Sequence, residues 1–539
     1  MKRVLALVLA TIMALSLVAC SSGAADNSAA TQADAQSATE AAKAEAPAAT
    51  EAAATEAAVP EVEYKEEVII GTDTKVNSLD IQENCAIASG YIYLMTHEPL
   101  VHYYEGEFFP KLAETWENKD GLEYTFHLRK GIKFHDGSEF SADDVLFTIK
   151  RAKENPTTHA NVKAFVDTIE SVTKVDDYTV VFKLTEVNND FLIDMSKTGS
   201  LGMLSEEACA AAEDGYKYGT GPWVNSEFFA EDHITVVRND DYWGELPVTK
   251  KVTFRLIPEA SARLIALENH EIDVCIYPDA SEYSLVEENP ELDMFTYTSG
   301  LNYIFYNVDQ APVDDPNFRL ALAYATDNQQ IIDGALGGYG VPATTTNSLT
   351  AVSFFDDFES VGQSKYTRDL DKAKEYLAKS KYPNGATVTI QFTTGQREII
   401  SQILQSQWKD IGVTVELDKT DSAGRAAAKQ EDKWQAYLAS VAYTDAGNSF
   451  SETFVTDGGT NQMGWSNARV DELFKQCAVE TDEAKRYEMY KEIQSIIHEE
   501  CPAYPMYYAL KAIAYNKKVS GVKWESRGVM EFAYAKVEK

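Results

Sequence analysis

The clearest alternation of hydrophobic and polar positions starts at residue 124. Tyr124, Phe126 and Leu128 are hydrophobic, and the residues between them are polar. This period of two predicts a β-strand with one buried face. Asp136 and Gly137 follow as a dipeptide typical of a tight turn, because glycine tolerates a positive φ angle. The pattern therefore predicts a strand that is followed by a turn.

A helix is predicted directly after this turn. Ser141 is suited to cap the first turn, and Asp144 stands at the third helical position, which completes a capping box. Phe140 and Val145 are placed for a hydrophobic staple at the same end. Pro156 predicts the end of the helix, because proline lacks an amide hydrogen and clashes with the preceding turn.

The rest of the chain alternates between strand and helix patterns. Residues 388–392 and 413–417 alternate as strands, and residues 398–411 between them have helical spacing. This β-α-β order predicts an α/β fold with a mixed sheet flanked by helices. Further strands are expected at residues 67–71, 172–175 and 178–184 and from residue 271, and further helices at residues 90–100, 259–269, 320–325, 371–379, 470–477 and 485–499.

Composition and charge restrict the class of partner. The 539 residues carry a net charge of −37, whereas a nucleic-acid-binding surface is basic, so nucleic acid is not expected as a partner. An aromatic content of 11% supports a globular body with a polar ligand cleft. The six cysteines form no C-x-x-C pair, and their spacing predicts neither a zinc site nor a full disulfide framework.

The N-terminus has the pattern of a secretory leader. Lys2 and Arg3 precede an apolar run over residues 4–18, and a cysteine follows at position 20. Leucine at −3, a small residue at −1 and cysteine at +1 resemble a bacterial lipobox. This implies a lipoprotein signal peptide over residues 1–20 and a diacylglyceride on the Cys20 sulfur. Residues 21–62 are expected to form a disordered Ala/Ser/Thr/Glu tether, because they contain no aromatic residue.

Several short sequence motifs, here called phrases, resemble the motifs of one protein family and follow in the same order along the chain. Leu112–Trp116 (LAETW) and Tyr124–Val145 (YTFHLRKGIKFHDGSEFSADDV) form the most specific part. Glu98–Val101, Gly219–Trp223 and Asp241–Gly244 match further phrases. The chain thus resembles the family-5 extracellular solute-binding proteins, the oligopeptide- and dipeptide-binding components of ABC importers, from about residue 67 to the C-terminus.

The resemblance implies an α/β fold of the periplasmic-binding-protein type, in its large three-lobed cluster (type II). Two lobes would close on a ligand cleft. The solute-binding body would span residues 63–539, with lobe I at about residues 63–103, 214–303 and 506–539, an extra subdomain at about residues 104–213, and lobe II at about residues 304–505.

The same resemblance implies a binding protein with no catalytic activity, no cofactor and no metal site. Its partners would be a short peptide or another small solute, an ABC permease with its ATPase, and the bacterial cell membrane through the N-terminal lipid. The protein is expected to be a monomer in the periplasmic or equivalent extracytoplasmic space. An oligosaccharide or a metal chelate is the alternative ligand, and single- and double-membrane cells both remain open.

The family phrase that binds a peptide's α-amino group has its counterpart between residues 439 and 450. Asp445 matches the second aspartate of the phrase W-x-A-D-Y-x-D-P, whereas the amine-binding first aspartate falls on Ala442 or Tyr443. An ammonium group that is buried without an anion costs several kcal/mol. Either Asp445 takes the role, or another acid does, or the ligand has no free α-amine.

Other ligand contacts are expected around this phrase and around the strand at residues 302–307. Trp434 and Tyr437 could form a stacking wall, and Arg425 and Lys429 could meet a carboxylate or simply face solvent. The remaining candidates are Tyr303, Tyr306, Asn307 and, in a loop near the N-terminus of the body, Cys85, together with Tyr443 of the phrase itself.

A secreted hydrolase on a lipoprotein tether is the alternative from another class. Ser171–Lys174 and Lys197–Gly199 match fragments of the motifs of penicillin-recognising enzymes, but the third motif is absent and Ser171 begins a predicted strand. No G-x-S-x-G, H-E-x-x-H or Walker A motif occurs. His97 and His102 could share a site for a metal-bearing ligand, or be unrelated packing residues.

Overall fold

The computed structural model describes residues 62–84, 86–104, 107–346, 366–393, 395–441, 450–525 and 529–539. Val62–Lys539 forms a unit separate from the residues before it. Cys20 and residues 21–61 of the predicted tether lie outside the described residues. Within the described part of the chain, no helix combines the length and the apolar content that crossing a bilayer requires.

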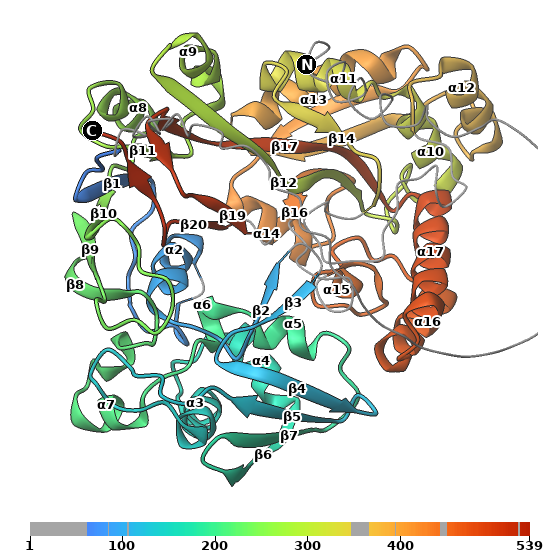
Figure 1. The fold of residues 1–539 in the computed structure, drawn as a ribbon. Coiled ribbons are helices and arrows are strands. Elements are labelled where there is room, and N and C mark those ends of the chain that lie inside the picture. The colour runs from blue at the N-terminus through green and yellow to red at the C-terminus, as the bar shows by residue number, and fades with distance from the viewer. Residues whose placement is uncertain are drawn as a thin grey trace, which may run out of the picture. The chain divides into compact units, whose positions relative to one another are not determined.

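A mixed sheet runs through Val62–Lys539 (Figure 1). In the described part of the chain it has 11 strands, in the order β15-β14-β16-β12-β17-β11-β1-β10-β9-β8, and β13 pairs with β17. β1 is parallel to β10 and β11, and β14 is parallel to β15 and β16. The strands are β1 (Glu67–Thr72), β8 (Trp223–Phe229), β9 (His233–Arg238), β10 (Lys251–Leu256), β11 (Val274–Ile276), β12 (Leu292–Tyr306), β13 (Gly340–Pro342), β14 (Thr387–Phe392), β15 (Thr414–Lys419), β16 (Ala436–Val441) and β17 (Ala503–Asn516).

β12 and β17 connect two sides of this sheet. β17 pairs with β11, which starts the β1 side (β11, β1, β10, β9 and β8), and β12 pairs with β16, which starts the β14 side (β16, β14 and β15). The β12–β17 register shifts between Thr298 and Leu301 and again between Asn302 and Tyr303. Such irregularities bend and twist strands locally. We call the part of β12 from Thr298 to Tyr303, with the residues of β17 that face it, the crossing, because the sheet passes there from one side to the other.

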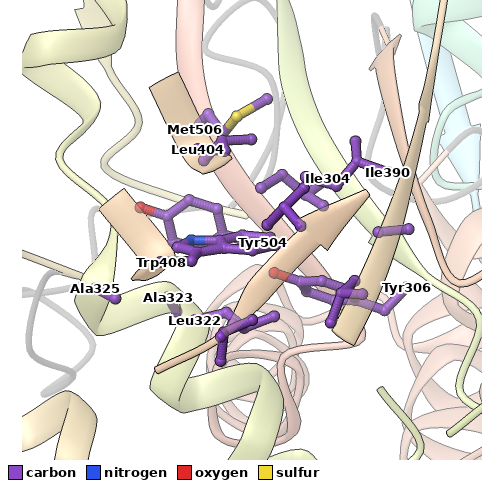
Figure 2. Packing of buried hydrophobic residues seen from close by; sticks show 14 of the residues in the cluster. Ile304, Tyr306, Leu322, Ala323, Ala325, Ile390, Leu404, Trp408, Tyr504 and Met506 are labelled. Carbon is purple, nitrogen blue, oxygen red and sulfur yellow. The ribbon is translucent and has the colours of Figure 1, made fainter. Parts of the chain in front are cut away.

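Hydrophobic clusters cover both faces of the β14 side. Ile304, Tyr306 and Trp408 belong to a cluster formed with α10 to α13 (Figure 2). Tyr303 and Phe305 point the other way, as the period of two in a strand requires, into a cluster formed with α15, α16 and α17. The helices of this side are α10 (Pro316–Ala325), α11 (Asn328–Leu336), α12 (Leu370–Lys379), α13 (Gln396–Lys409), α14 (Ser422–Gln430), α15 (Ser451–Phe454), α16 (Ala468–Val479) and α17 (Glu483–Glu500).

The β1 side is covered in the same way. Ile70 packs in the cluster that includes α2 and the C-terminal hairpins, whereas Ile69 packs on the opposite face against the cluster of α8 and α9. These elements are α2 (Ile87–Thr96), α8 (Ala260–Glu268), α9 (Tyr283–Glu288), β18 (Val519–Ser520), β19 (Lys523–Glu525), β20 (Val529–Glu531) and β21 (Lys536–Val537).

The predicted strand, turn and helix are confirmed. β5 (Glu123–Leu128) buries its alternate side chains, and Gly137 has a φ of 91°. The Ser141 and Asp144 side chains form the capping box of α3 (Ala142–Glu154). β5 belongs to a four-stranded sheet, β4-β5-β7-β6, and the predicted hairpin around Asp176 is its β6–β7 pair. The other elements here are β2 (Val101–Tyr104), β3 (Glu107–Pro110), β4 (Ala113–Lys119), β6 (Ile169–Asp176), β7 (Thr179–Leu184), α4 (Ala160–Asp167), α5 (Phe191–Met195), α6 (Thr198–Leu201) and α7 (Glu206–Ala211).

Several predicted boundaries are wrong: α10 begins at Pro316 rather than at residue 320, α2 at Ile87 rather than at residue 90, and β6 at Ile169 rather than at residue 172. Two further differences have a clear physical cause. α2 ends at Thr96 rather than at residue 100, because Pro99 disfavours helical geometry in the residue before it, and the chain is already extended at His97. β11 begins only after Asp273, whereas the sequence pattern predicts a strand from residue 271. The Asp273 carboxylate accepts a hydrogen bond from the Ile69 amide at 2.9 Å, which occupies a backbone donor of the neighbouring strand.

A buried carboxylate joins the four-stranded subdomain to the main sheet. The side chain of Glu98 is 2% exposed and accepts hydrogen bonds from the Tyr242 hydroxyl at 2.7 Å and from the Thr220 hydroxyl and the Trp243 indole, each at 2.8 Å. The Lys111 ammonium lies 3.0 Å from it. A buried charge is tolerated when its lone pairs have donors. Glu98 thus holds together segments that are distant in the sequence.

The glycines of the Gly219–Trp223 phrase allow a close backbone approach beside Glu98. A Cβ atom on Gly219 would lie 2.2 Å from the Thr96 carbonyl oxygen, and one on Gly221 would lie 2.5 Å from the Met95 carbonyl oxygen. Both distances are below any normal contact. The phrase therefore needs glycine at both positions for α2 to pack against this loop.

Two histidines are buried at the same place. The ring nitrogens of His97 lie 2.9 Å from the Thr96 hydroxyl and 3.1 Å from the Tyr216 carbonyl oxygen. Burial lowers the pKa of His97 from its ordinary value of 6.5 to about 3, and the neighbouring His135 adds to this. Burial also lowers the pKa of His135, whose Nε2 lies 2.9 Å from the Gly221 carbonyl oxygen. We infer that both rings are neutral at pH 7.

Glu98→Gln is expected to lower the free energy of unfolding by about 3 kcal/mol, because an amide has one acceptor oxygen and turns an NH₂ group toward donors. The measurement is urea unfolding of the full chain at pH 7, followed by circular dichroism. Glu114→Gln is the control: its side chain is 59% exposed, lies 3.7 Å from Arg129, and should change stability by less than about 0.5 kcal/mol. If both substitutions changed the free energy of unfolding equally, Glu98 would not be the group that joins the subdomain to the main sheet.

Stability should fall as the pH is lowered from 7 to 5.5. In that window the unfolded chain protonates histidine 97 whereas the folded chain does not, because its folded pKa is about 3. The unfolded state then binds more protons, so His97 alone should remove about 1 kcal/mol of stability. Urea unfolding at both pH values measures this difference, and His97→Gln should make it smaller. An unchanged difference in that variant would show that His97 is not the group that titrates.

Candidate ligand site

The parallel strands β1 and β11 end next to each other, and Tyr277 directly follows β11. Ligands of open α/β sheets bind beyond the carboxyl ends of parallel strands. Tyr277 has a φ of 54°, a left-handed conformation that is unusual for a side chain of this size. The buried Arg263 guanidinium donates a hydrogen bond of 2.6 Å to the Tyr277 carbonyl oxygen, which supports this conformation.

Three tyrosine hydroxyls meet at this point. The Tyr277 hydroxyl lies 3.1 Å from that of Tyr91 in α2 and 2.9 Å from that of Tyr297 in β12. The Lys511 ammonium lies 4.4 Å from the centre of the Tyr277 ring. Burial raises the pKa of Tyr91 and Tyr297, so both phenols keep their protons. These four residues form the tyrosine cluster. Tyr277, Tyr297 and Lys511 are half-buried and can offer hydroxyl groups and a cation to a ligand, whereas Tyr91 is buried and supports the Tyr277 hydroxyl from the interior.

The tyrosine cluster lies next to the crossing. Tyr297 pairs with Lys511 across β12 and β17, and Leu301 follows four residues later. Leu301 pairs with Val441, the last residue of β16. β16 therefore ends beside the crossing, and the predicted amine-binding phrase continues from that end.

A second polar and aromatic group lies on the β14 side. Arg425 of α14 stacks on Trp434 and on Tyr437 of β16, with its guanidinium carbon 4.0 and 4.1 Å from the ring centres. Gln391 and Gln462 accept hydrogen bonds from it. Burial lowers the pKa of Arg425, and the residue is only 7% exposed. These five residues form the arginine stack.

The structure brings together two of the predicted site residues, Trp434 and Tyr437, with Arg425 between them. Arg425 is buried, so the prediction that it could simply face solvent is wrong, whereas Lys429 is exposed. Three other predicted contacts, Cys85, Tyr443 and Asp445, lie outside the described residues.

Tyr303 and Tyr306 lie inside the protein rather than at a described cleft. Both are fully buried on opposite faces of β12. Tyr303 donates a hydrogen bond to the Thr346 carbonyl oxygen, and Tyr306 packs among the apolar residues of Figure 2. Their burial gives a ligand no access, so neither residue is part of the site we propose below.

Asn307 is also buried and has a local partner. Its amide donates a hydrogen bond of 2.6 Å to the Asp432 carboxylate, and Gln310 donates to the same carboxylate at 2.9 Å. Asp432 has a φ of 53° and belongs to the turn before β16. Asn307 thus supports the turn that leads to Trp434 and is left out of the proposed site.

The two histidines considered for a metal-bearing ligand do not form a pair. His97 has both ring nitrogens engaged in the interior, and His102 is half-buried in β2, stacked on Tyr104 with ring centres 6.4 Å apart. Within the described ranges, no group of three histidine, cysteine, aspartate or glutamate side chains is arranged to hold a metal ion.

Sequence reasoning missed the tyrosine cluster. Tyr91, Tyr277, Tyr297 and Lys511 are spread over 420 residues of sequence, and single tyrosines in an aromatic-rich chain carry little signal. The one usable signal was local: Tyr277 directly follows a short apolar strand, at the end where ligands of such sheets bind.

The mixed sheet has two sides that are joined by two long strands, and polar and aromatic groups lie beside the crossing. This arrangement defines a periplasmic-binding-protein-like fold. The chain belongs to the bacterial extracellular solute-binding proteins of family 5. The family model described as "Bacterial extracellular solute-binding proteins, family 5 Middle" matches residues 107–462. This family consists of solute-binding proteins rather than enzymes.

Individual relatives cover most of the chain. The dipeptide-binding protein of Escherichia coli is 28% identical over 471 residues, which span 80% of this chain and 86% of that protein. Heme-binding protein A of Haemophilus influenzae is 28% identical over 459 residues, spanning 76% and 81%. The structure of HbpA2 from Haemophilus parasuis superposes with a TM-score of 0.79 and 25% identity, and covers 88% of this chain and 100% of that one.

Proposed function

We propose that this protein is the extracytoplasmic substrate-binding lipoprotein of an ABC importer, and that it captures short peptides and delivers them to a membrane permease driven by a cytoplasmic ATPase. Two comparisons support the proposal: the family model matches residues 107–462, and a dipeptide-binding relative aligns over 80% of the chain. The chain would act by binding alone, without chemistry on the ligand.

The proposed movement is closure of lobe I and lobe II around the ligand, about the crossing. β12 and β17 are shared by both sides of the sheet, and their pairing is irregular between Thr298 and Leu301. Irregular pairing gives a strand local freedom to bend. A ligand that contacts both sides favours the closed form, because only that form offers both sets of contacts at once.

The proposed ligand groups follow from the chemistry of the two clusters. The half-buried hydroxyls of Tyr277 and Tyr297 suit the carbonyl and amide groups of a peptide backbone, and the half-buried ring of Tyr437 suits its side chains. Trp434 is 4% exposed and would support this wall from the interior. The α-amino group would pair with Asp445 through a charge-assisted hydrogen bond. Tyr443 and Cys85 remain proposed neighbours of the ligand.

Heme or another metal chelate is the second candidate ligand. A heme-binding relative has the same 28% identity as the dipeptide-binding one, so identity does not separate the two. In addition, this chain has Ala442 or Tyr443 at the position where the family phrase has its amine-binding aspartate. Both facts are consistent with a ligand that has no free amine.

Native mass spectrometry of the protein, purified without denaturation, should reveal short peptides in a 1:1 complex. A mixture of di- to pentapeptides, and hemin in parallel, are the added probes. We expect peptide complexes and no hemin complex. Binding of hemin without any peptide would overturn the peptide assignment and support the second candidate.

Cys20 should carry the lipid. In a bacterial host supplied with an alkyne-tagged fatty acid, the full chain should become labelled and fractionate with membranes. Cys20→Ser should lose the label completely, because the sulfur that accepts the diacylglyceride is removed. Cys209→Ser, a change at a half-buried cysteine of the body, is the matched control and should keep the label. Labelling of the Cys20→Ser chain would refute the proposed lipid anchor.

A further inference from the structure

Buried polar contacts fix the four-stranded subdomain to the β1 side of the sheet. In addition to the contacts of Glu98, the Arg151 guanidinium of α3 pairs with the Asp80 carboxylate, whose side chain is 2% exposed. Gln82, in the same loop between β1 and α2, donates a hydrogen bond of 2.9 Å from its amide to the Thr148 carbonyl oxygen of α3. Breaking such contacts inside the protein is costly, so the subdomain and the β1 side form one rigid part.

Asn189 of the subdomain connects this rigid part to the β14 side. It lies in the loop between β7 and α5. Its side-chain amide donates hydrogen bonds to the carbonyl oxygens of Cys477 at 3.1 Å, Ala478 at 3.2 Å and Glu480 at 3.0 Å, all at the C-terminal end of α16. α16 packs in the cluster that it forms with α15 and α17 on the β14 side. One side chain therefore bridges the two sides of the sheet at a distance from the crossing.

The C-terminal end of a helix suits an amide donor of this kind. The last four carbonyl groups of a helix have no partner within it, and together they form the negative end of the helix dipole. The NH₂ group of an asparagine has two hydrogens, which it can share among three neighbouring oxygens. Asn189 thus completes the cap of α16 from another part of the molecule. Three such contacts at once require one relative position of the two parts.

A second contact lies beside this bridge. A Cβ atom on Gly121, in the turn between β4 and β5, would lie 3.0 Å from a methyl group of Val187 and 3.7 Å from the methyl group of Thr481. Val187 belongs to the loop that carries Asn189, and Thr481 to the loop that follows the capped end of α16. The turn, the Asn189 loop and the end of α16 therefore pack together at one place.

This contact lies on the same side of the crossing as the candidate ligand groups. In Figure 1 the subdomain and α16 are below β12 and β17, and so are α2 and α14, which carry Tyr91 and Arg425. A rotation about the crossing that opens a cleft between α2 and α14 therefore also moves the subdomain away from α16. Points far from the axis of a rotation are displaced most, so opening would separate Asn189 from its three carbonyl groups while β12 and β17 stay paired.

We propose that Asn189 is a clasp that holds the two lobes closed by capping α16; this rests on the proposed function. The hydrogen bonds of the clasp exist only in the closed form, so they shift the equilibrium between the open and closed forms toward the closed one. A ligand leaves through the open form. The clasp therefore slows the release of every captured ligand to the same extent, without contacting any of them.

The test measures how fast peptides leave the full chain. The protein is loaded with an equimolar mixture of di- to pentapeptides, diluted into an excess of the same mixture with an isotope label, and sampled over time by native mass spectrometry. Asn189→Ala should release every bound peptide about 10-fold faster than the wild type, because the closed form has lost the clasp. Asn189→Asp should have a larger effect, since a carboxylate cannot donate and is repelled by the end of the helix.

Asn188→Ala is the matched control. The Asn188 side chain accepts a hydrogen bond of 2.9 Å from the Asp190 amide within the same loop, so this substitution loosens the loop but removes no donor to α16. Its release rates should stay within about 2-fold of the wild type. Thermal unfolding shows whether each variant is folded, and if one Asn189 variant is not, the other carries the test.

Small-angle X-ray scattering without added peptide gives a second readout that does not depend on binding. Asn189→Asp should shift the chain toward the open form and increase the radius of gyration. Asn188→Ala should leave the radius unchanged.

The outcomes separate this inference from the proposed function. Release at the wild-type rate by both Asn189 variants, or equally fast release by Asn188→Ala, would refute the clasp and leave peptide capture standing. Faster release of only some peptides would refute it too, because it would show contact with a ligand instead of an effect on closure. If the wild type binds no peptide, the proposed function fails and the scattering comparison decides on the clasp: a larger radius for Asn189→Asp supports it, and an equal radius overturns it.

Discussion

The buried carboxylate of Glu98 is the interaction on which the joint between the subdomain and the main sheet depends. Hydroxyl and indole groups of Thr220, Tyr242 and Trp243 donate to it, and Lys111 pairs with it. The donors come from three segments that are far apart in the sequence, so each segment is held by the same charge. Three of the further phrases that resemble the family, Glu98–Val101, Gly219–Trp223 and Asp241–Gly244, thus supply this buried anion and the three groups that donate to it. The anion cannot be left uncompensated.

Arg425 shows what a buried charge does when its partners are incomplete. The saturated guanidinium groups of Arg263 and Arg319 fasten turns and strand ends through backbone carbonyl groups. Arg425 has two long bonds to neutral amides and aromatic rings over its faces. A charge that is well satisfied stabilises the fold, whereas one that is oriented but unsatisfied gains most from an anion that arrives later.

The two long strands β12 and β17 position both the tyrosine cluster and the group around Arg425. The tyrosine cluster and the end of β16 are tied to neighbouring positions of β12, so the proposed closure about the crossing would move both. Peptides and heme, the ligands named for two relatives, both carry carboxylates, so a guanidinium suits either. The tyrosine hydroxyls and the predicted Asp445 pairing, rather than Arg425, are then the features that favour a peptide.

The sequence by itself determined the local structure and the family. Alternation over Tyr124–Leu128 and the Ser141 capping box need only neighbouring residues, so they were predictable, and the ordered phrases identified the family that the comparisons then established. Only the tertiary structure decided which polar residues are interior and which have partners. Tyr277 meets Lys511, 234 residues away, and Arg425 is buried rather than exposed, because strand pairing and helix packing set these neighbours and no local pattern encodes them.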